Sequence, residues 1–199
     1  EHGIDALIVL GTTGESPTVH LEERKELTKI AVAKAGGQIP VIIGTGTNDT
    51  VKVIEMNELA AKQGADGVLI VTPYYNKTSQ KGLIDHYTHI ALKTELPIIV
   101  YNVPSRTGVN IEAESFKKMS ELESNIVAIK EASGNISQIL KTNEISAPEK
   151  YILSGNDDQT LPIMTSGGKG VISVFSNLLP GVMKEITSKI IENKYQEAR

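Results

Sequence analysis

Short apolar runs alternate along this chain with longer segments in which apolar residues recur at helical spacing. Short runs that are apolar almost throughout are typical of strands covered on both faces, as in parallel sheets. The alternation therefore predicts an α/β protein built on a parallel sheet. The predicted strands are residues 4–10, 40–44, 67–71, 97–101, 126–129, 151–153 and 170–174.

Four of the intervening segments carry an apolar stripe with the period of an α-helix. Gly36 and Gly64 follow two of them and suit the left-handed residue that often comes after a helix. The stripes comprise Leu27, Ile30, Ala31 and Ala35; Val53, Asn57 and Ala60, with Leu59 beside them; Ile136, Ile139 and Leu140; and Met183, Ile186 and Ile190.

Polar and glycine-rich segments follow nearly every predicted strand. An open parallel sheet gathers its site at one switch point, whereas a barrel builds its site from most of its strand-to-helix loops. The pattern therefore favours a (β/α)8 TIM barrel. Seven βα units are recognisable, and we expect residues 1–199 to form one barrel domain that is truncated at both ends. The first strand and a C-terminal helical region would then be missing.

Composition narrows the classes of function. The 20 Lys and Arg residues against 24 Asp and Glu give a net charge of −4 without any basic block, which argues against nucleic-acid binding. No apolar run approaches the ~20 residues of a membrane span. The chain has no cysteine for a disulfide or zinc site, which fits a cytoplasmic location. The four histidines suggest no metal site, and His86 and His89 are expected on a helix surface.

Lys130 follows four apolar residues at the end of a predicted strand. In a barrel its side chain can enter the low-dielectric interior, where complete burial lowers the pKa of a lysine by ~3–5. The resulting neutral amine is what attack on a ketone requires. Lys130 is therefore the candidate covalent lysine. The alternative is a solvated lysine paired with Glu131.

Three neighbouring features could serve a lysine of this kind. Tyr101 ends the preceding strand, and its phenol can relay protons. Arg106 follows on a loop with Pro and Gly, where a guanidinium can bind a carboxylate through two hydrogen bonds. Residues 11–16 form a Gly-flanked turn whose N–H groups and hydroxyls can bind an anion. The alternatives are a structural tyrosine, a solvated arginine and an ordinary turn.

Seven short motifs together resemble the pyruvate-dependent class I aldolase superfamily, which includes N-acetylneuraminate lyase. Within it, the dihydrodipicolinate synthase (4-hydroxy-tetrahydrodipicolinate synthase) family is the most similar, over about residues 3–177. Each motif is weak alone, but the set in this order and spacing is highly specific. The motifs are G-T-T-G-E-S at 11–16, G-T-G-x-N at 44–48, T-P-Y-Y-N at 72–76, Y-N-V-P-S-R-T-G at 101–108, I-K-E-A-S-G at 129–134, S-G-N-D at 154–157 and G-V-I-S-V at 170–174.

The resemblance implies a carbon-oxygen lyase of the diaminopimelate and lysine pathway that needs neither cofactor nor metal. It would condense pyruvate with L-aspartate 4-semialdehyde to 4-hydroxy-tetrahydrodipicolinate. The implied roles are as follows: Lys130 forms the imine; Tyr101 donates and accepts protons in a relay with Thr13 and Tyr75; Thr12 and Thr13 hold the pyruvate carboxylate; Arg106 receives the second carboxylate; and Gly155 and Ile172 line the pyruvate pocket. The family's use of Tyr75 across a subunit interface implies a dimer or tetramer.

The resemblance also suggests how the family's lysine inhibition changes in this chain. Ser16, Asn48 and Tyr74 match the inhibitory pocket, but Leu21, Arg24 and Lys52 replace the His and Glu residues found in lysine-sensitive members. A cation at position 52 repels the ammonium group of a bound lysine. We therefore expect weak inhibition by lysine, or none.

Three other functions remain open from the sequence. An N-acetylneuraminate lyase or a 2-keto-3-deoxy sugar-acid aldolase shares the Lys, Tyr and Gly-Thr motifs, although Arg106 and the Tyr74–Tyr75 pair favour the synthase. A non-catalytic barrel that senses a small carboxylate would form no reducible imine. A phosphate-sugar isomerase would bind phosphate at residues 11–16, but no catalytic carboxylate–His pair is evident.

Overall fold

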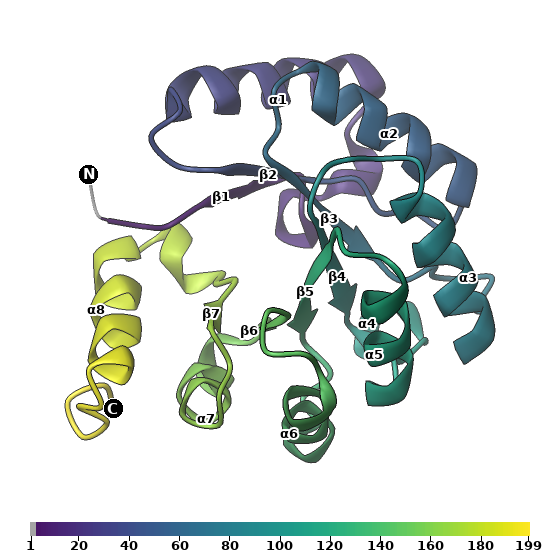
Figure 1. Ribbon diagram of the computed structural model, residues 1–199. Helices are drawn as coiled ribbons and strands as arrows, with labels where there is room; N and C mark the ends of the chain where they lie inside the picture. Colours follow the sequence, from purple (N-terminus) through teal and green to yellow (C-terminus); the bar gives the residue numbers. More distant parts are fainter. Residues whose placement is uncertain (1–2) are drawn as a thin grey trace.

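A computed structural model describes residues 3–199 and places seven parallel strands in one curved sheet with helices on its outer side (Figure 1). The strands pair in chain order from β1 to β7, so the predicted parallel α/β barrel architecture is confirmed. All seven predicted strands are present, with ends shifted by a few residues. They are β1 (Leu7–Val9), β2 (Val41–Gly44), β3 (Gly67–Val71), β4 (Ile98–Asn102), β5 (Ile126–Glu131), β6 (Tyr151–Ser154) and β7 (Gly170–Val171).

Helical elements connect successive strands. Short 3-10 turns lie at several strand exits, and they bring polar side chains to the same end of the sheet. The helices are α1 (Leu21–Ala35), α2 (Thr50–Lys62), α3 (Gln80–Ala91), α4 (Pro104–Thr107), α5 (Ala113–Leu122), α6 (Ile136–Ile145), α7 (Thr160–Thr165) and α8 (Pro180–Ile191); the 3-10 turns are η1 (Thr12–Gly14), η2 (Ser16–Thr18), η3 (Asp157–Gln159) and η4 (Phe175–Asn177).

The two faces of the sheet belong to different apolar clusters. Val68, Ile70 and Val100 pack outward against the helices, whereas Leu69 and Ile99 belong to a smaller inner cluster. This division follows from the two-residue period of a strand, which sends successive side chains to opposite faces. One irregularity interrupts it: Ile98 pairs with Ile126, but Ile99 pairs with Ala128, so β5 carries one extra residue at Val127. That bulge sets which residues of the β5 end face inward.

The sheet is open between β1 and β7, which are not paired in the part of the chain that the structure describes. Helix α8 lies against the start of β1, because Lys184 of α8 donates to Asp5 just before β1 at 2.7 Å. Figure 1 accordingly shows α8 near the start of β1. Across residues 3–199, no helix combines the length and apolarity needed to cross a bilayer.

Three expectations about helices were wrong. The predicted α1 stripe holds at Ala35 but fails at Leu27 and Ile30, which are 40% and 47% exposed, because α1 buries Thr28 beside Ala35 in their place. Leu140 of the predicted α6 stripe is likewise 40% exposed. His86 was expected on a helix surface but is buried, and its Nδ1 lies 2.9 Å from the Thr50 hydroxyl. Burial and the nearby His89 lower the pKa of His86 to about 4, so this ring is a neutral core group.

Candidate active site

The exits of β4 and β5 bring the two central candidates together. Tyr101 pairs with Lys130 across the two strands, and Lys130 Nζ lies 4.3 Å from the centroid of the Tyr101 ring. The sequence had predicted a strand that ends at residue 129, directly before Lys130. In the structure Lys130 is part of β5. Because the lysine sits within the strand, the sheet itself fixes its direction.

Lys130 is 8% exposed and faces the inner side of the sheet. Burial lowers its pKa to about 8, the negative charge of Asp157 acts in the opposite direction, and the positive charge of Arg106 adds to the decrease. A pKa in this range makes a substantial fraction of the amine neutral near physiological pH, as a nucleophilic lysine needs. The alternative of a solvated lysine is therefore not supported by its position.

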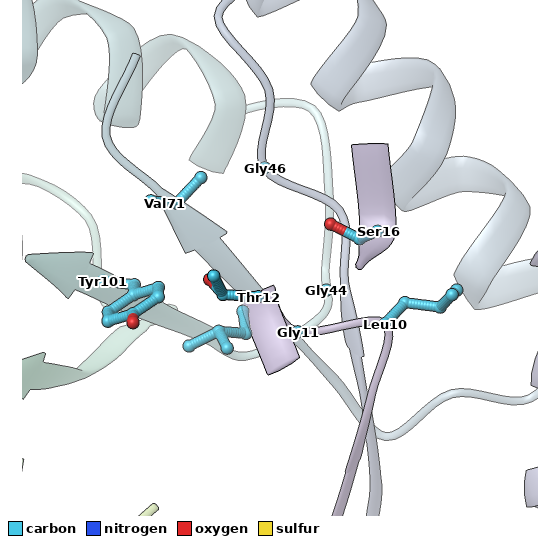
Figure 2. Close-up of a pocket in the computed structure, with 9 residues that line it drawn as sticks. Leu10, Gly11, Thr12, Ser16, Gly44, Gly46, Val71 and Tyr101 are labelled. Atoms are coloured by element: carbon cyan, nitrogen blue, oxygen red, sulfur yellow. The ribbon is translucent and has the colours of Figure 1, made fainter. Parts of the chain in front are cut away.

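The phenol of Tyr101 is also buried, and it lines a small cavity of about 20 Å³ at the ends of β1 to β4 (Figure 2). Burial raises the pKa of Tyr101, while a hydrogen bond with Thr12 and the charge of Arg106 oppose that rise. The phenol is thus held in its protonated form beside the amine, able first to donate and then to accept a proton. The cavity is lined by Leu10, Gly11, Thr12, Ser16, Gly44, Gly46, Leu69, Val71 and Tyr101.

Thr12 and Thr13 lie on η1, directly after β1, with exposed side chains. As the first residues of a 3-10 turn, they present N–H groups that the turn itself cannot satisfy, as an anion requires. Thr12 lies close to the Tyr101 phenol, because a hydrogen bond with Thr12 opposes the rise in the pKa of Tyr101. Figure 2 shows Thr12 and Tyr101 lining the same cavity.

Arg106 lies on the single helical turn α4 rather than on an irregular loop. Pro104 begins this turn, and Gly108 ends it in the left-handed conformation at φ 68°. The guanidinium is exposed, yet close enough for its charge to act on both Lys130 and Tyr101. Arg106 can therefore bind an anionic group at the mouth of the site.

Gly155 has no side chain, and the Lys130 side chain packs in the space that a side chain at position 155 would take. A Cβ at this position would lie 3.1 Å from Lys130 Cε and 2.7 Å from Ala132 Cβ. The Gly155 N–H donates to Glu131 O at 2.7 Å, and the Ile172 N–H donates to Ser154 O at 2.8 Å. Both predicted pocket residues therefore lie beside the end of β5 that carries Lys130, held there by their backbone hydrogen bonds.

Gly155→Ala is expected to slow imine formation between the Lys130 amine and a small ketone by about 10- to 100-fold, because a small displacement of a reacting group has an effect of this order. The added methyl group would collide with the Lys130 side chain. Pre-steady-state trapping of the imine measures the rate. Gly170→Ala is the matched control, since a Cβ there meets only Leu153 Cδ2 at an ordinary 3.7 Å. Equal rates for the two variants would contradict the prediction.

Tyr75 does not pack into the site of its own chain. Its side chain is 89% exposed, and its backbone adopts a left-handed φ of 70°. A non-glycine residue in that region is strained unless its surroundings hold it. Within its own chain, Tyr75 therefore stands apart from the buried Tyr101 and Lys130.

Sequence reasoning assigned no role to Asp157, although it ends the S-G-N-D motif. Its Oδ2 accepts from Val174 N at 3.1 Å and Phe175 N at 3.0 Å, so the carboxylate joins the exits of β6 and β7. Its charge also raises the pKa of Lys130. The signal available in the sequence was an acidic residue two positions after the predicted pocket glycine.

No group of three or more His, Cys, Asp or Glu side chains within residues 3–199 is arranged to hold a metal ion. Among the described histidines, His86 is engaged with Thr50. The arrangement at the strand exits is instead a buried amine, a buried phenol, a hydroxyl-bearing turn and an exposed guanidinium.

Comparison with known proteins gives concordant results. A model of the dihydrodipicolinate synthetase family matches residues 1–199. A 4-hydroxy-tetrahydrodipicolinate synthase from Thermoanaerobacter sp. (strain X514) is 47% identical over 199 residues, covering 100% of this chain and 67% of the relative. The solved dihydrodipicolinate synthase of Thermotoga maritima is 46% identical with a TM-score of 0.98, over 100% of this chain and 68% of that chain. That of Acinetobacter baumannii, complexed with pyruvate, is 38% identical with a TM-score of 0.96, over 99% and 67%. The chain thus spans about two thirds of the length of these relatives.

Proposed function

Because this chain belongs to the dihydrodipicolinate synthetase family, we propose that Lys130 forms an imine with pyruvate and that the enzyme condenses it with L-aspartate 4-semialdehyde. The observation that carries the proposal is the contact between Lys130 and Tyr101, an amine of lowered pKa held 4.3 Å from the centre of a protonated phenol ring. A nucleophile beside a proton donor and acceptor is the arrangement that carbinolamine formation and dehydration need.

The reaction begins when the neutral Lys130 amine attacks the ketone carbon of pyruvate. Tyr101 supplies a proton to the leaving hydroxyl, so that water departs and an iminium remains. Thr12, which contacts the phenol, and Thr13 beside it hold the pyruvate carboxylate with their hydroxyl and N–H groups. Figure 2 shows Thr12 at the β1 exit close to Tyr101, which supports a carboxylate site there.

The iminium then acts as an electron sink. Loss of a proton from the methyl group gives an enamine, whose carbon attacks the aldehyde of the second substrate. The amine of that substrate finally adds to the iminium carbon, closes the ring and releases Lys130. Arg106 receives the carboxylate of the semialdehyde, because a guanidinium at the mouth of the site can bind it through two hydrogen bonds.

Self-association completes this proposal. Tyr75 is largely exposed in its own chain, so its hydroxyl would join the Tyr101 relay of a second copy, with Thr12 or Thr13 between them. At least a dimer is then the active form. The relatives that this chain matches are about one and a half times as long, and the activity is proposed for the full chain.

The experiment supplies pyruvate with each of two aldehydes to the full chain. The proposal expects a cyclic product with L-aspartate 4-semialdehyde and none with N-acetylmannosamine, which an N-acetylneuraminate lyase would use. Borohydride added with pyruvate alone should leave a mass increase on the peptide containing Lys130. A chain that binds pyruvate without any such adduct would be a carboxylate sensor instead.

Imine formation is expected to depend on pH through Lys130 itself. The rate should rise with pH and level off with a midpoint near 8, because only the deprotonated amine attacks and burial lowers the pKa of Lys130 to about 8. Trapping the imine over a pH series measures the midpoint. A midpoint near 10.5, the ordinary value for a lysine, would contradict the assignment.

Inhibition by lysine is expected to be weak or absent. Arg24 donates to Gly44 O at 3.2 Å and Val19 O at 3.3 Å and also to Ser16 O, so a partly buried guanidinium lies beside the matching residues Ser16 and Tyr74. Lys52 adds a second cation that repels the ammonium group of a ligand. Titrating the condensation rate with lysine is the measurement, and strong cooperative inhibition would refute the expectation.

A further inference from the structure

Glu131 is the one carboxylate in the described part of the chain that is fully buried, and it is adjacent to Lys130. It has no cationic partner within residues 3–199, and its oxygens accept only from neutral donors. Asn102 Nδ2 and Gln138 Nε2 donate to Oε1 at 2.9 and 3.3 Å, and Ser133 Oγ donates to Oε2 at 2.7 Å. Burial raises the pKa of Glu131, and these hydrogen bonds oppose that rise. A buried ionisable group of this kind is costly unless its hydrogen bonds are complete.

The register of β4 and β5 determines which side of the sheet these hydrogen bonds lie on. Tyr101 pairs with Lys130, and the next pair is Asn102 with Glu131. Successive strand residues point to opposite faces, so the first pair faces the site and the second faces the helices. The 2.9 Å bond between Asn102 and Glu131 therefore fastens the outer side of the same strand exits whose inner side carries the amine and the phenol.

The same network fixes the segment that carries Arg106. Asn102, before α4, accepts at Oδ1 from Ile111 N at 3.0 Å and donates to Asn110 Oδ1 at 3.0 Å. Gln138 of α6 exchanges bonds with Asn110 at 2.7 and 3.3 Å. Residues 103–110 are thus a loop whose two ends are joined through Asn102. These hydrogen bonds between the two ends of the loop fix the position of α4, which carries Arg106.

We propose that Glu131 is a positioning residue for this reaction, one that holds Lys130 against Tyr101 through Asn102 and holds the Arg106 turn through the chain Asn102–Asn110–Gln138. This inference rests on the proposed function. Glu131 does not face the substrate, so it acts only through the residues it aligns. The carboxylate suits this task because Oε1 accepts from Asn102 of β4 and Gln138 of α6, while Oε2 accepts from Ser133 after β5.

The main test is Glu131→Gln in the full chain. The amide nitrogen must then face either the two side-chain amide donors or Ser133, whose hydroxyl can accept from it but whose N–H cannot. Asn102 cannot turn over to accept from it without abandoning Ile111 N. We expect imine formation with pyruvate to slow by about tenfold or more, since misplacement by a fraction of an ångström is enough. The KM for the semialdehyde should also rise. Thermal unfolding and circular dichroism show whether the variant is folded.

Lys150→Met is the matched control for a purely structural effect. Lys150 is also buried, and it donates to Ile126 O at 2.9 Å and Ser124 O at 3.2 Å at the opposite end of β5. Its loss should lower the melting temperature while leaving both kinetic constants within about twofold, because the site end of β5 keeps its bonds. If Glu131→Gln behaves in the same way, the positioning role is overturned.

Asn110→Ala keeps the proposal testable if Glu131→Gln fails to fold. It removes the side-chain hydrogen bonds of Asn110 with Asn102 and Gln138, and it leaves the Asn102–Glu131 bond in place. The expected result is a several-fold higher KM for the semialdehyde with an unchanged rate of imine formation, a division that general destabilisation does not produce. An equal loss in both would overturn the proposal. Absence of imine in the wild-type chain would instead refute the proposed function.

Discussion

Lys130→Met is expected to abolish the trapped imine and to reduce condensation by three or more orders of magnitude, on the order of what loss of a covalent nucleophile does. Methionine keeps a side chain of similar length in a buried position while removing the amine. The fold should therefore persist, and removal of a desolvated amine should, if anything, raise the melting temperature. The measurements are peptide mass after borohydride treatment, steady-state rate and thermal unfolding.

Lys150→Met again serves as the control, because Lys150 is the other buried lysine of the described residues. Its amine is held by two backbone carbonyls at the far end of β5 and has no phenol beside it. The adduct should persist in that variant. An adduct that survives Lys130→Met, or one that maps to Lys150, would show that a different amine captures pyruvate.

Tyr101→Phe is expected to lower the condensation rate by about 10²–10⁴-fold, the usual contribution of a positioned proton donor and acceptor. The ring stays beside Lys130, so burial of the amine and its lowered pKa are retained. Binding of pyruvate should change little, whereas dehydration of the carbinolamine should become slow. Rapid-quench trapping separates these steps.

Tyr87→Phe is the matched control for Tyr101→Phe. Tyr87 is fully buried on the outer side of the sheet, where its hydroxyl donates to Ile70 O at 3.0 Å. Losing that bond should cost about 1 kcal/mol of unfolding free energy without slowing the reaction. Equal kinetic losses in the two variants would mean that the Tyr101 hydroxyl acts on packing and not on protons.

The strands and the site motifs could be predicted from the sequence because both depend on residues that are close together along the chain. Apolar runs mark strands buried on two faces, and the residue after each run marks a strand exit, so Lys130, Tyr101 and Arg106 could be placed at one end of a barrel. Roles such as those of Thr13 and Tyr75 came from family resemblance. They remain predictions, with Thr12 the threonine that contacts Tyr101.

Other features could not be read from the sequence because they depend on partners distant along the chain. The α1 stripe failed at Leu27 and Ile30 because the helix turns Thr28 to the sheet beside Ala35, a choice made by packing rather than by periodicity. His86 was predicted to lie on the surface, but it is buried next to Thr50, which is 36 residues earlier in the chain. The buried state of Glu131 was equally hidden, because its donors lie on β4 and α6.

The extra residue at Val127 has a consequence for how this gene can vary. Beyond it, Lys130 points inward and Glu131 outward. Loss of the codon for Val127 would remove the bulge but leave Ala128 opposite Ile99 and Lys130 opposite Tyr101, so the amine would still point inward. One residue added after the bulge, between Ala128 and Lys130, would instead shift the phase by one position and turn the amine towards the helices. This stretch can therefore lose its bulged residue, but a single insertion after it should be as damaging as loss of the lysine itself.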